Sequence, residues 1–388
     1  MSIRKIRTAQ SCATEARRAV EEFHAEVAQP STELVVFFCS SEYDLEALAA
    51  EMNRLFAGVR VVGCTTAGEI GTTGYRSHSL SGASFPAGGF VAVSGVLDCL
   101  SGFGIARGHD FAQTLLQQLE GRAPQAGPDN SFGFMLIDGL SVREEPVANA
   151  LHYALGKMPM FGGSAGDDLK FAGTHVFGDG RFHTDSVVLT LINTALPFTI
   201  FKTQHFVSTE ERLVVTEADP ARRIVNEING LPAAAEYARL VGVEVQELNS
   251  MRFAASPVVV MLDGTDYVRS IQKANADGSL TFYCAIEEGL VLRSAHGVDL
   301  VNNLERAFDK IREEIGPPQL VFGCDCVLRN LEISQKGLKD RVGEIFSRNN
   351  TIGFSCYGEQ FQGVHVNQTL TGCAIGSARE EDRGGHDG

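Results

Sequence analysis

Tryptophan is absent from the chain, and tyrosine occurs only 7 times, whereas phenylalanine occurs 24 times. Large aromatic surface therefore comes almost entirely from rings without polar atoms, which suit a core or a pocket for a flat apolar ligand. Continuous apolar runs of membrane-spanning length are missing as well, and the first residues lack the apolar segment of a signal peptide. We expect a cytoplasmic protein without membrane insertion.

The chain has fewer positively charged than negatively charged residues. The chain has 33 lysine and arginine residues against 48 aspartate and glutamate residues, which gives a formal net charge of −15. A negative mean surface potential repels phosphate backbones, so we expect no nucleic-acid partner. The 9 cysteines are an odd number and scattered along the chain, which argues against a disulfide framework and for a reducing compartment.

One arrangement of apolar runs occurs three times. A strand-like run is followed by a helix-periodic segment and then by a second apolar run that ends in a glycine-rich turn. The copies cover residues 34–69, 133–167 and 320–359. Each has the length that a β-α-β unit requires, so we expect three such units. The expected fold class is α+β, with two domains built from β-α-β units and mixed, largely antiparallel sheets.

Each copy ends in glycine, a few small residues, a second glycine and then an acidic residue. The three glycine-acid pairs are Gly68-Glu69, Gly166-Asp167 and Gly358-Glu359. Alternating β-rich runs follow the second copy and lead into an alanine-rich helical segment near residue 233. From this pattern we expect four segments along a chain of 388 residues, which is long enough for two cores. They are an N-terminal helix (1–30), a first domain (31–220), a second domain (221–376) and a disordered polar tail (377–388).

The middle turn contains a serine in the sequence GGSAG, residues 162–166, which has the G-x-S-x-G form of a hydrolase nucleophile elbow. Such an elbow needs a helix directly after the serine, whereas a glycine-rich, strand-like segment follows Ser164. We therefore interpret Ser164 as a turn residue beside a ligand pocket and expect no catalytic residue. A serine hydrolase is the alternative from another class, because Asp185 and His205 follow Ser164 in the chain order of a hydrolase triad.

Cys324 and Cys326 form a C-x-C pair, which has two candidate thiolate ligands for a metal such as zinc. No second cysteine pair or histidine pair lies nearby in the sequence. A redox role is also open, although Asp325 between the two thiols tends to raise their pKa rather than activate them.

Several of these motifs together resemble a known family. The glycine-acid turns, FGGSAGDDL, INGLPAAAEYARL and GFSCYGEQFQGVHVNQTLTG are similar to the FIST sensory module, with its N-terminal and C-terminal halves in tandem over residues 33–376. The resemblance implies a signal-input protein that binds a small ligand. GCDCVLRNLE looks most like the NosP-type nitric-oxide-sensing haem proteins, which implies haem b and regulation of a sensor histidine kinase. This chain has no kinase segment of its own, so the kinase would be a separate protein.

A haem in this protein would be of the b type, because no C-x-x-C-H motif for covalent attachment occurs. Histidine is the usual proximal ligand of a gas sensor. Of the 10 histidines, the first candidate is His205, which lies in an apolar strand pattern near the expected domain boundary. The alternatives are His183, at the start of a strand, and His365, in the closing family motif.

Polar residues of the third turn predict a different site. Tyr357, Glu359, His365 and Asn367 lie in a short window around the turn and its return strand, with Gln368 next to them. On a strand, Tyr357 and Glu359 share one face, as do His365 and Asn367. These side chains are suited to an amino acid or another small polar metabolite, and the alternative is that they only satisfy buried backbone groups around the turn.

Overall fold

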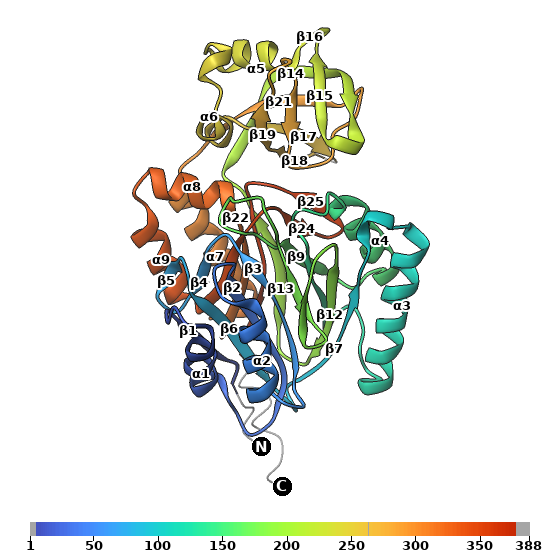
Figure 1. Cartoon of the computed structure of the whole chain (residues 1–388), viewed down its shortest axis with the longest axis vertical. Helices are drawn as coiled ribbons and strands as arrows, with labels where there is room; N and C mark the ends of the chain where they lie inside the picture. Colours follow the sequence, from blue (N-terminus) through green and yellow to red (C-terminus); the bar gives the residue numbers. More distant parts are fainter. Residues whose placement is uncertain (1–4, 263, 378–388) are drawn as a thin grey trace.

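The computed structural model describes residues 5–262 and 264–377 of the chain. It consists of two parts. The body, formed by residues 5–205 and 298–377, contains three six-stranded sheets, and the inserted unit, residues 206–297, forms a further sheet above it (Figure 1). The expected α+β class with mixed, largely antiparallel sheets is confirmed.

The three sheets of the body have similar designs. The first has the order β1 (Arg7–Ser11), β6 (Leu80–Pro86), β2 (Thr32–Ser40), β3 (Arg60–Thr66), β10 (Val176–Gly178), β11 (Arg181–His183). The second has the order β25 (Val364–Val366), β24 (Glu359–Phe361), β9 (Met160–Ser164), β8 (Ser131–Ile137), β12 (Val187–Thr194), β7 (Phe90–Leu97). The third has the order β13 (Phe198–Thr203), β26 (Leu370–Ile375), β22 (Leu320–Cys326), β23 (Thr351–Cys356), β4 (Glu69–Gly71), β5 (Gly74–Arg76).

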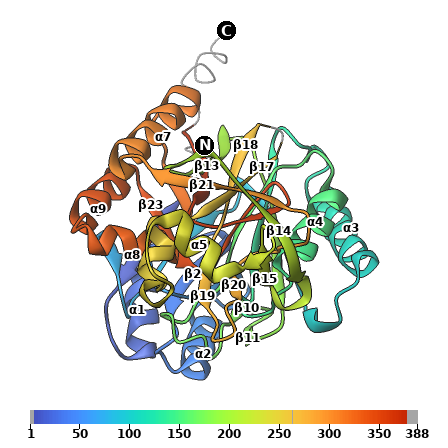
Figure 2. The ribbon, with the colours of Figure 1, turned by 90° about the horizontal axis from the view of Figure 1, so that it is seen from above.

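Helices cover the outer faces of these sheets in three groups, which are visible around the rim of the body in Figure 2. The groups are α1 (Ala16–Val27) with α2 (Leu45–Leu55); α3 (Ile105–Arg122) with α4 (Glu144–Leu155); and α7 (Leu300–Ile315) with α8 (Val327–Gln335) and α9 (Lys339–Arg348). Local sequence fixes where several of them begin. Asp44 and Asp299, for example, accept hydrogen bonds from the free backbone N–H groups of the first turns of α2 and α7. Among the described residues, no helix is long and apolar enough to cross a membrane.

The three expected β-α-β units are confirmed. The parallel strand pairs are β2 with β3, β8 with β9, and β22 with β23, each joined by helix on the outside of the sheet. At the same point of each second strand stands a glycine: Gly63, Gly162 or Gly353. A Cβ atom at any of these positions would clash with a carbonyl oxygen of the first strand, which explains the repeated glycine.

A short hairpin follows each unit and joins the sheet of another unit. The β4–β5 hairpin of the first unit pairs with β23 of the third, β24–β25 of the third pairs with β9 of the second, and β10–β11 of the second pairs with β3 of the first. The exchange closes the three units into a ring. A non-glycine residue with positive φ ends each hairpin region, namely His78, Asp185 and Gln368, which shows that the three hairpins follow the same path.

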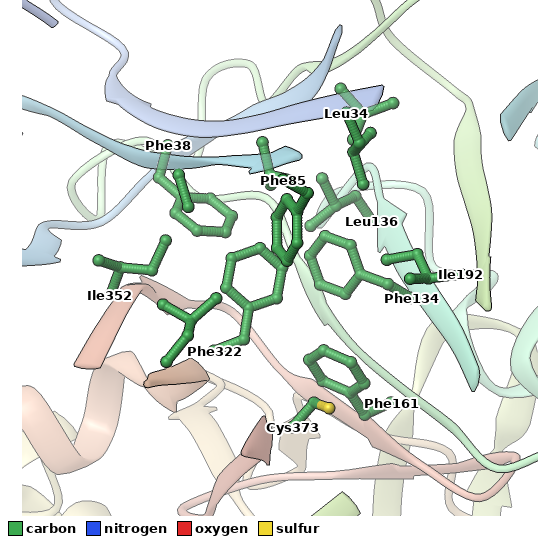
Figure 3. Close-up of a cluster of buried hydrophobic side chains, with 14 of the residues drawn as sticks. Leu34, Phe38, Phe85, Phe134, Leu136, Phe161, Ile192, Phe322, Ile352 and Cys373 are labelled. Atoms are coloured by element: carbon green, nitrogen blue, oxygen red, sulfur yellow. The ribbon is translucent and has the colours of Figure 1, made fainter. Parts of the chain in front are cut away.

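The inner faces of the three sheets meet in one aromatic core (Figure 3). Phe38 and Phe85 come from the first sheet, Phe134 and Phe161 from the second, and Phe322 from the third. Phe134 lies 4.8 Å from Phe322 and Phe38 lies 5.5 Å from it, measured between ring centroids. Because each buried phenylalanine contributes about 1.5–3 kcal/mol, this shared core is the main force that holds the ring together. The abundant phenylalanine is therefore used for a core.

The inserted unit contains one curled sheet with its own core, which includes Leu213, Val225, Tyr237 and Phe253. Its strands are β14 (Phe206–Asp219), β15 (Ile224–Ile228), β16 (Leu231–Pro232), β17 (Val258–Leu262), β18 (Thr265–Arg269), β19 (Ile271–Ala274), β20 (Leu280–Phe282) and β21 (Val291–Gly297). Its helices are α5 (Ala233–Val241) and α6 (Ser250–Ala255), together with short 3-10 helices at Pro220–Arg222 and Val245–Glu247. A further 3-10 helix, Leu100–Gly102, lies in the body.

The expected division of the chain falls inside this unit. Residue 220 lies in the 3-10 helix between β14 and β15, which are neighbouring strands. In the body, β23 from the expected second domain pairs with β4 from the first. The division into 31–220 and 221–376 stays a prediction. The N-terminal helix is α1, and it is preceded by β1; of the expected tail, residues 378–388 lie outside the described residues.

Candidate functional site

The first and third hairpins hold their acidic residues in matching cages. The carboxylate of Glu69 accepts hydrogen bonds from the backbone N–H of Ser79 at 3.0 Å and from its hydroxyl at 2.8 Å. Glu359 accepts the same two bonds from Thr369, at 3.1 and 2.7 Å. Both carboxyls are buried, and burial raises the pKa of Glu69 to about 7 and that of Glu359 to about 8. Glu359, expected to bind ligand, is thus fully used in fixing the hairpin.

Tyr357, the second residue of the expected ligand site, fixes the loop after β9. Its hydroxyl donates to the carboxylate of Asp167 and accepts a 2.9 Å hydrogen bond from the backbone N–H of Leu169. The other face of that carboxylate caps the loop by accepting from the backbone N–H groups of residues 171–173. Phe171 from the same loop stacks on Tyr357 with a centroid distance of 4.8 Å. The acid of the middle turn therefore shapes a loop, unlike Glu69 and Glu359.

His365 lies on β25, beneath the inserted unit, and only 2% of its surface is exposed. Nε2 of Gln360 lies 3.1 Å from Nδ1 of His365 and 3.0 Å from Oγ of Ser164. Because an amide nitrogen only donates, Nδ1 is the acceptor and the ring proton lies on Nε2. Burial lowers the pKa of His365 to about 4, although the charge of Glu145 opposes this shift. His365 is therefore a neutral donor at neutral pH.

Asn367 is completely buried, and neither atom of its amide group has a hydrogen-bond partner among the described residues. Three further unpartnered buried atoms belong to His365 and to the two residues that contact it: Nε2 of His365, Oε1 of Gln360 and Nε of Arg269. Gly358 brings two of these groups together, because a Cβ built there would lie 2.7 Å from Nε2 of His365 and 3.3 Å from Nδ2 of Asn367. Buried polar atoms are rarely left without partners. We call Gln360, His365, Asn367 and Arg269 the junction site.

Contacts from the inserted unit close this site from above. Nη1 of Arg269, at the end of β18, donates to the carbonyl oxygen of His365 at 3.3 Å. Gln368 accepts from the hydroxyl of Ser270 at 3.2 Å and donates to the carbonyl of Ala254 at 2.6 Å. In Figure 1 the β24–β25 hairpin accordingly lies directly below β17 and β18. The site is shared between the body and the inserted unit.

A buried ion pair links the two parts next to the junction site. Arg223 of the inserted unit lies 2.5 Å from a carboxylate oxygen of Glu144 and 2.6 Å from one of Glu145, both at the start of α4. The second oxygen of Glu145 accepts from the backbone N–H of Ala285 at 2.5 Å. Burial and the adjacent charge of Glu145 raise the pKa of Glu144, whereas Arg223 opposes this shift. Separating the two parts would leave these groups without partners.

His205 lies where the chain passes from the body into the inserted unit. Its carbonyl accepts from the backbone N–H of Val298, where the chain returns, at 2.8 Å. Its ring is fully buried, with Nη1 of Arg329 at 3.2 Å from Nδ1 and Oε2 of Glu332 at 2.9 Å from Nε2. Arginine only donates, so the lone pair of the ring faces Arg329 and the N–H faces Glu332. Burial lowers the pKa of His205, although Glu332 opposes this effect.

This arrangement does not fit an axial haem ligand, because iron needs a free imidazole lone pair and Arg329 occupies that of His205. The two alternatives are separated from His205 in the structure. Nε2 of His183 lies 3.1 Å from the carbonyl oxygen of Gly178, so it donates, and His365 belongs to the junction site. The haem b prediction itself is not tested by these contacts and stays a prediction.

Cys324 and Cys326 are both buried on β22, and burial raises the pKa of each thiol well above its ordinary value. Such thiols are protonated and are poor metal ligands or nucleophiles in this state. Within residues 5–262 and 264–377, no group of three or more histidine, cysteine, aspartate or glutamate side chains is placed to hold a metal ion. The metal and redox interpretations of the pair stay predictions.

Ser164 is the last residue of β9, and non-helical chain follows it as far as β10. In the described part of the chain, its hydroxyl is bonded to Gln360 rather than to an imidazole. The two other residues of the alternative triad are used elsewhere. Asp185 accepts from the backbone N–H and the hydroxyl of Ser101, both at 2.8 Å, and His205 contacts Arg329 and Glu332. The geometry favours the interpretation of Ser164 as a turn residue.

The expected ligand residues are thus brought together only in part. His365 and Asn367 share the junction site, whereas Tyr357 and Glu359 fix loops around it. Sequence reasoning missed Gln360 and Arg269. Gln360 lies in the closing motif and faces His365 across the hairpin, which the alternation of a strand pair could have indicated. No local signal marks Arg269, since it reaches the site from another part of the chain.

The FIST N domain matches residues 33–231, and the FIST C domain matches residues 233–362. The chain belongs to the FIST family. Domains of this family are generally signalling domains that sense small ligands. The resemblance stated for the sequence is confirmed at this level, and the two family domains meet within the inserted unit.

Two further comparisons add little. A search of the curated proteins finds no match. Among solved structures, the one described as "Cyanuric acid hydrolase: evolutionary innovation by structural concatenation" is 10% identical, with a TM-score of 0.37. The alignment covers 96% of this chain and 99% of that chain. At this level of similarity the match supports no conclusion about fold or activity.

Proposed function

We propose that this FIST protein is a sensor that binds a small polar metabolite at the junction site and reports its presence through the position of the inserted unit. The observation that carries the proposal is Asn367, a buried amide group without a hydrogen-bond partner in the part of the chain that the structure describes. A buried, unpartnered polar group costs about 1–3 kcal/mol. A ligand that supplies the missing partners would recover this cost and provide binding energy.

The location of the site explains how ligand binding would change the position of the inserted unit. Arg269 comes from the inserted unit, whereas Gln360, His365 and Asn367 come from the body. Because these body residues are at most 2% exposed, a ligand enters only when the inserted unit moves away from β25. Binding therefore favours one position of the unit over another, to the extent of the difference in ligand affinity between the two. A separately encoded histidine kinase that contacts the inserted unit would read this difference.

Asn367→Leu tests the site directly. Thermal unfolding of the wild-type protein is measured in the presence of a library of amino acids, organic acids, nucleosides and sugars. We expect at least one compound to raise Tm of the wild-type protein, since a ligand stabilises the state it binds. The same compound should not raise Tm of Asn367→Leu. The control is Ser77→Leu, at the matching but exposed position of the first hairpin.

Two results would contradict the proposal. One is that no compound in the library raises Tm of the wild-type protein. The other is an equal rise in wild-type protein and Asn367→Leu, which would place the ligand elsewhere.

Haem and nitric oxide sensing form the more specific version of the sensor, supported by the resemblance of GCDCVLRNLE to the NosP-type proteins. Bound haem would supply an iron that binds nitric oxide. His205 would have to release Arg329 to bind that iron, so Arg329→Leu should strengthen haem retention if His205 is the ligand. The Soret band after haem reconstitution of the wild-type protein, Arg329→Leu, His205→Ala and His183→Ala measures haem retention in each and so tests this expectation.

A serine hydrolase is the alternative from another class. Ester hydrolysis by the wild-type protein that is lost in Ser164→Ala would establish it. The contacts of Ser164 with Gln360, and of Asp185 with Ser101, favour the sensor.

A further inference from the structure

Charge at the junction site is not balanced. Arg223 is paired with Glu144 and Glu145, and the raised pKa of Glu144 favours its neutral form, so this group of three is close to neutral as a whole. Arg269 has no such partner. Among the described residues, no carboxylate forms an ion pair with its guanidinium, whose polar contact is the carbonyl oxygen of His365. One positive charge is therefore left without an ion-pair partner beside His365.

The remaining donors of the site are uncharged. His365 carries its proton on Nε2 and stays neutral because burial lowers its pKa to about 4. Nδ2 of Asn367 is a second neutral donor without a partner. His365 and Asn367 thus place two neutral N–H donors beside Gly358, and the guanidinium of Arg269, a charged donor, lies at the backbone carbonyl of His365. This combination suits an anionic oxygen acceptor, because a hydrogen bond from a guanidinium to a carboxylate is charge-assisted.

Among residues 5–262 and 264–377, a ligand with an ammonium group would find no free carboxylate in the contacts of this region. Both oxygens of Glu145 are occupied, by Arg223 and by the backbone N–H of Ala285. Glu359 is enclosed by Thr369 and Cys356. The unpartnered acceptors are Oδ1 of Asn367 and Oε1 of Gln360, which are neutral amide oxygens. Such oxygens suit a hydroxyl donor, whereas a buried ammonium without a counter-charge would cost several kcal/mol.

From this set of groups we infer that the ligand of the junction site is a small carboxylate that carries a hydroxyl group and no ammonium group. Its carboxylate would accept from Arg269, His365 and the amide N–H of Asn367, and its hydroxyl would donate to an amide oxygen of Asn367 or Gln360. The inference rests on the proposed function, because it specifies the ligand of that same site.

A matched set of compounds tests the inference by isothermal titration calorimetry. The hydroxy acids are glycolate, lactate and 2-hydroxybutyrate; glycine, alanine and 2-aminobutyrate replace the hydroxyl with an ammonium group; glycolamide, lactamide and 2-hydroxybutyramide replace the carboxylate with an amide. We expect at least one hydroxy acid to bind about tenfold more tightly than its amino and amide counterparts, as the loss of one charge-assisted hydrogen bond predicts.

Variants of Arg269 complete the test. Arg269→Gln should weaken binding of that hydroxy acid about tenfold or more, whereas Arg269→Lys, which keeps the charge, should weaken it less. Arg212→Gln, at an exposed position of the same sheet, is the control and should bind as the wild-type protein does. Because Arg269 is only half-buried, we expect all three variants to fold, and circular dichroism verifies this.

Three outcomes would overturn the inference: tighter binding of an amino acid or an amide, hydroxy-acid binding that Arg269→Gln leaves unchanged, and no binding by any of the nine compounds. None of these contradicts the proposed function as long as another compound of the larger library depends on Asn367. If no compound of the library requires Asn367 for binding, both the inference and the proposed function are contradicted.

Discussion

The first and third hairpins are built alike and are used differently. Glu69 and Glu359 occupy matching cages, and the residues that end the two hairpin regions, His78 and Gln368, share a positive φ. Yet the position that holds Tyr75 in the first hairpin holds His365 in the third, opposite Ile70 and Gln360 respectively. Tyr75 donates to the carboxylate of Asp325 in the body, whereas His365 faces the inserted unit. The repeated acid thus belongs to the architecture, and the variable strand beside it carries the candidate function.

The cages themselves should produce the largest effect. Glu69→Ala and Glu359→Ala each remove the acceptor of two buried donors, so each should lower the free energy of unfolding by about 3–5 kcal/mol. Urea denaturation of both variants measures the loss. Glu69→Gln and Glu359→Gln, which retain one acceptor oxygen, are the matched controls and should lose less. A large loss in only one of the two alanine variants would break the equivalence of the hairpins.

Tyr75 and His365 should separate the two roles. Tyr75→Phe removes a hydrogen bond to a buried carboxylate and should lower the free energy of unfolding by about 2 kcal/mol. His365→Phe should cost less, because Gln360 keeps its bond to Ser164, but it should weaken ligand binding. Chemical denaturation and calorimetry of both variants report the two quantities. Equal stability losses with unchanged binding would show that both hairpins are purely structural.

The pH dependence of the free energy of unfolding should also distinguish the two cages, although this effect is smaller than those of the substitutions above. In each, the pKa of the folded carboxyl is raised, so the folded state keeps a proton that the unfolded state has released. Stability therefore falls as pH rises from the unfolded value of 4.5 to the folded value, about 7 for Glu69 and about 8 for Glu359. Between pH 7 and 8, we expect Glu359 to lower the free energy of unfolding by about 1 kcal/mol and Glu69 by about a third of that.

Denaturation of Glu359→Gln and Glu69→Gln at pH 7 and 8 measures this contribution. The decrease between these two pH values should become much smaller in Glu359→Gln and remain nearly complete in Glu69→Gln. The opposite result would assign the higher pKa to the first cage.

The elements that could be predicted are those with a local cause. The three β-α-β units follow from apolar periodicity, and Gly63, Gly162 and Gly353 mark their close strand contacts. His365 and Asn367 could be named as candidate site residues because they lie in one short motif. Tyr357 and Glu359 belong to that motif as well, but whether a polar side chain faces a ligand or a backbone N–H depends on neighbours such as Thr369 and Leu169. That choice is not visible in strand alternation.

By itself, the sequence determined the strands, the helices, the glycines and acids of the turns, and the supply of phenylalanine for a common core. Only the tertiary structure decided that each hairpin joins the sheet of another unit, and that Arg269 lies over His365 while Arg329 occupies the lone pair of His205. The physical reason is the separation along the chain over which each kind of interaction acts. Periodicity and turn chemistry act within a few residues, whereas the pairing of sheet edges and of buried charges depends on which distant segments the shared core brings together.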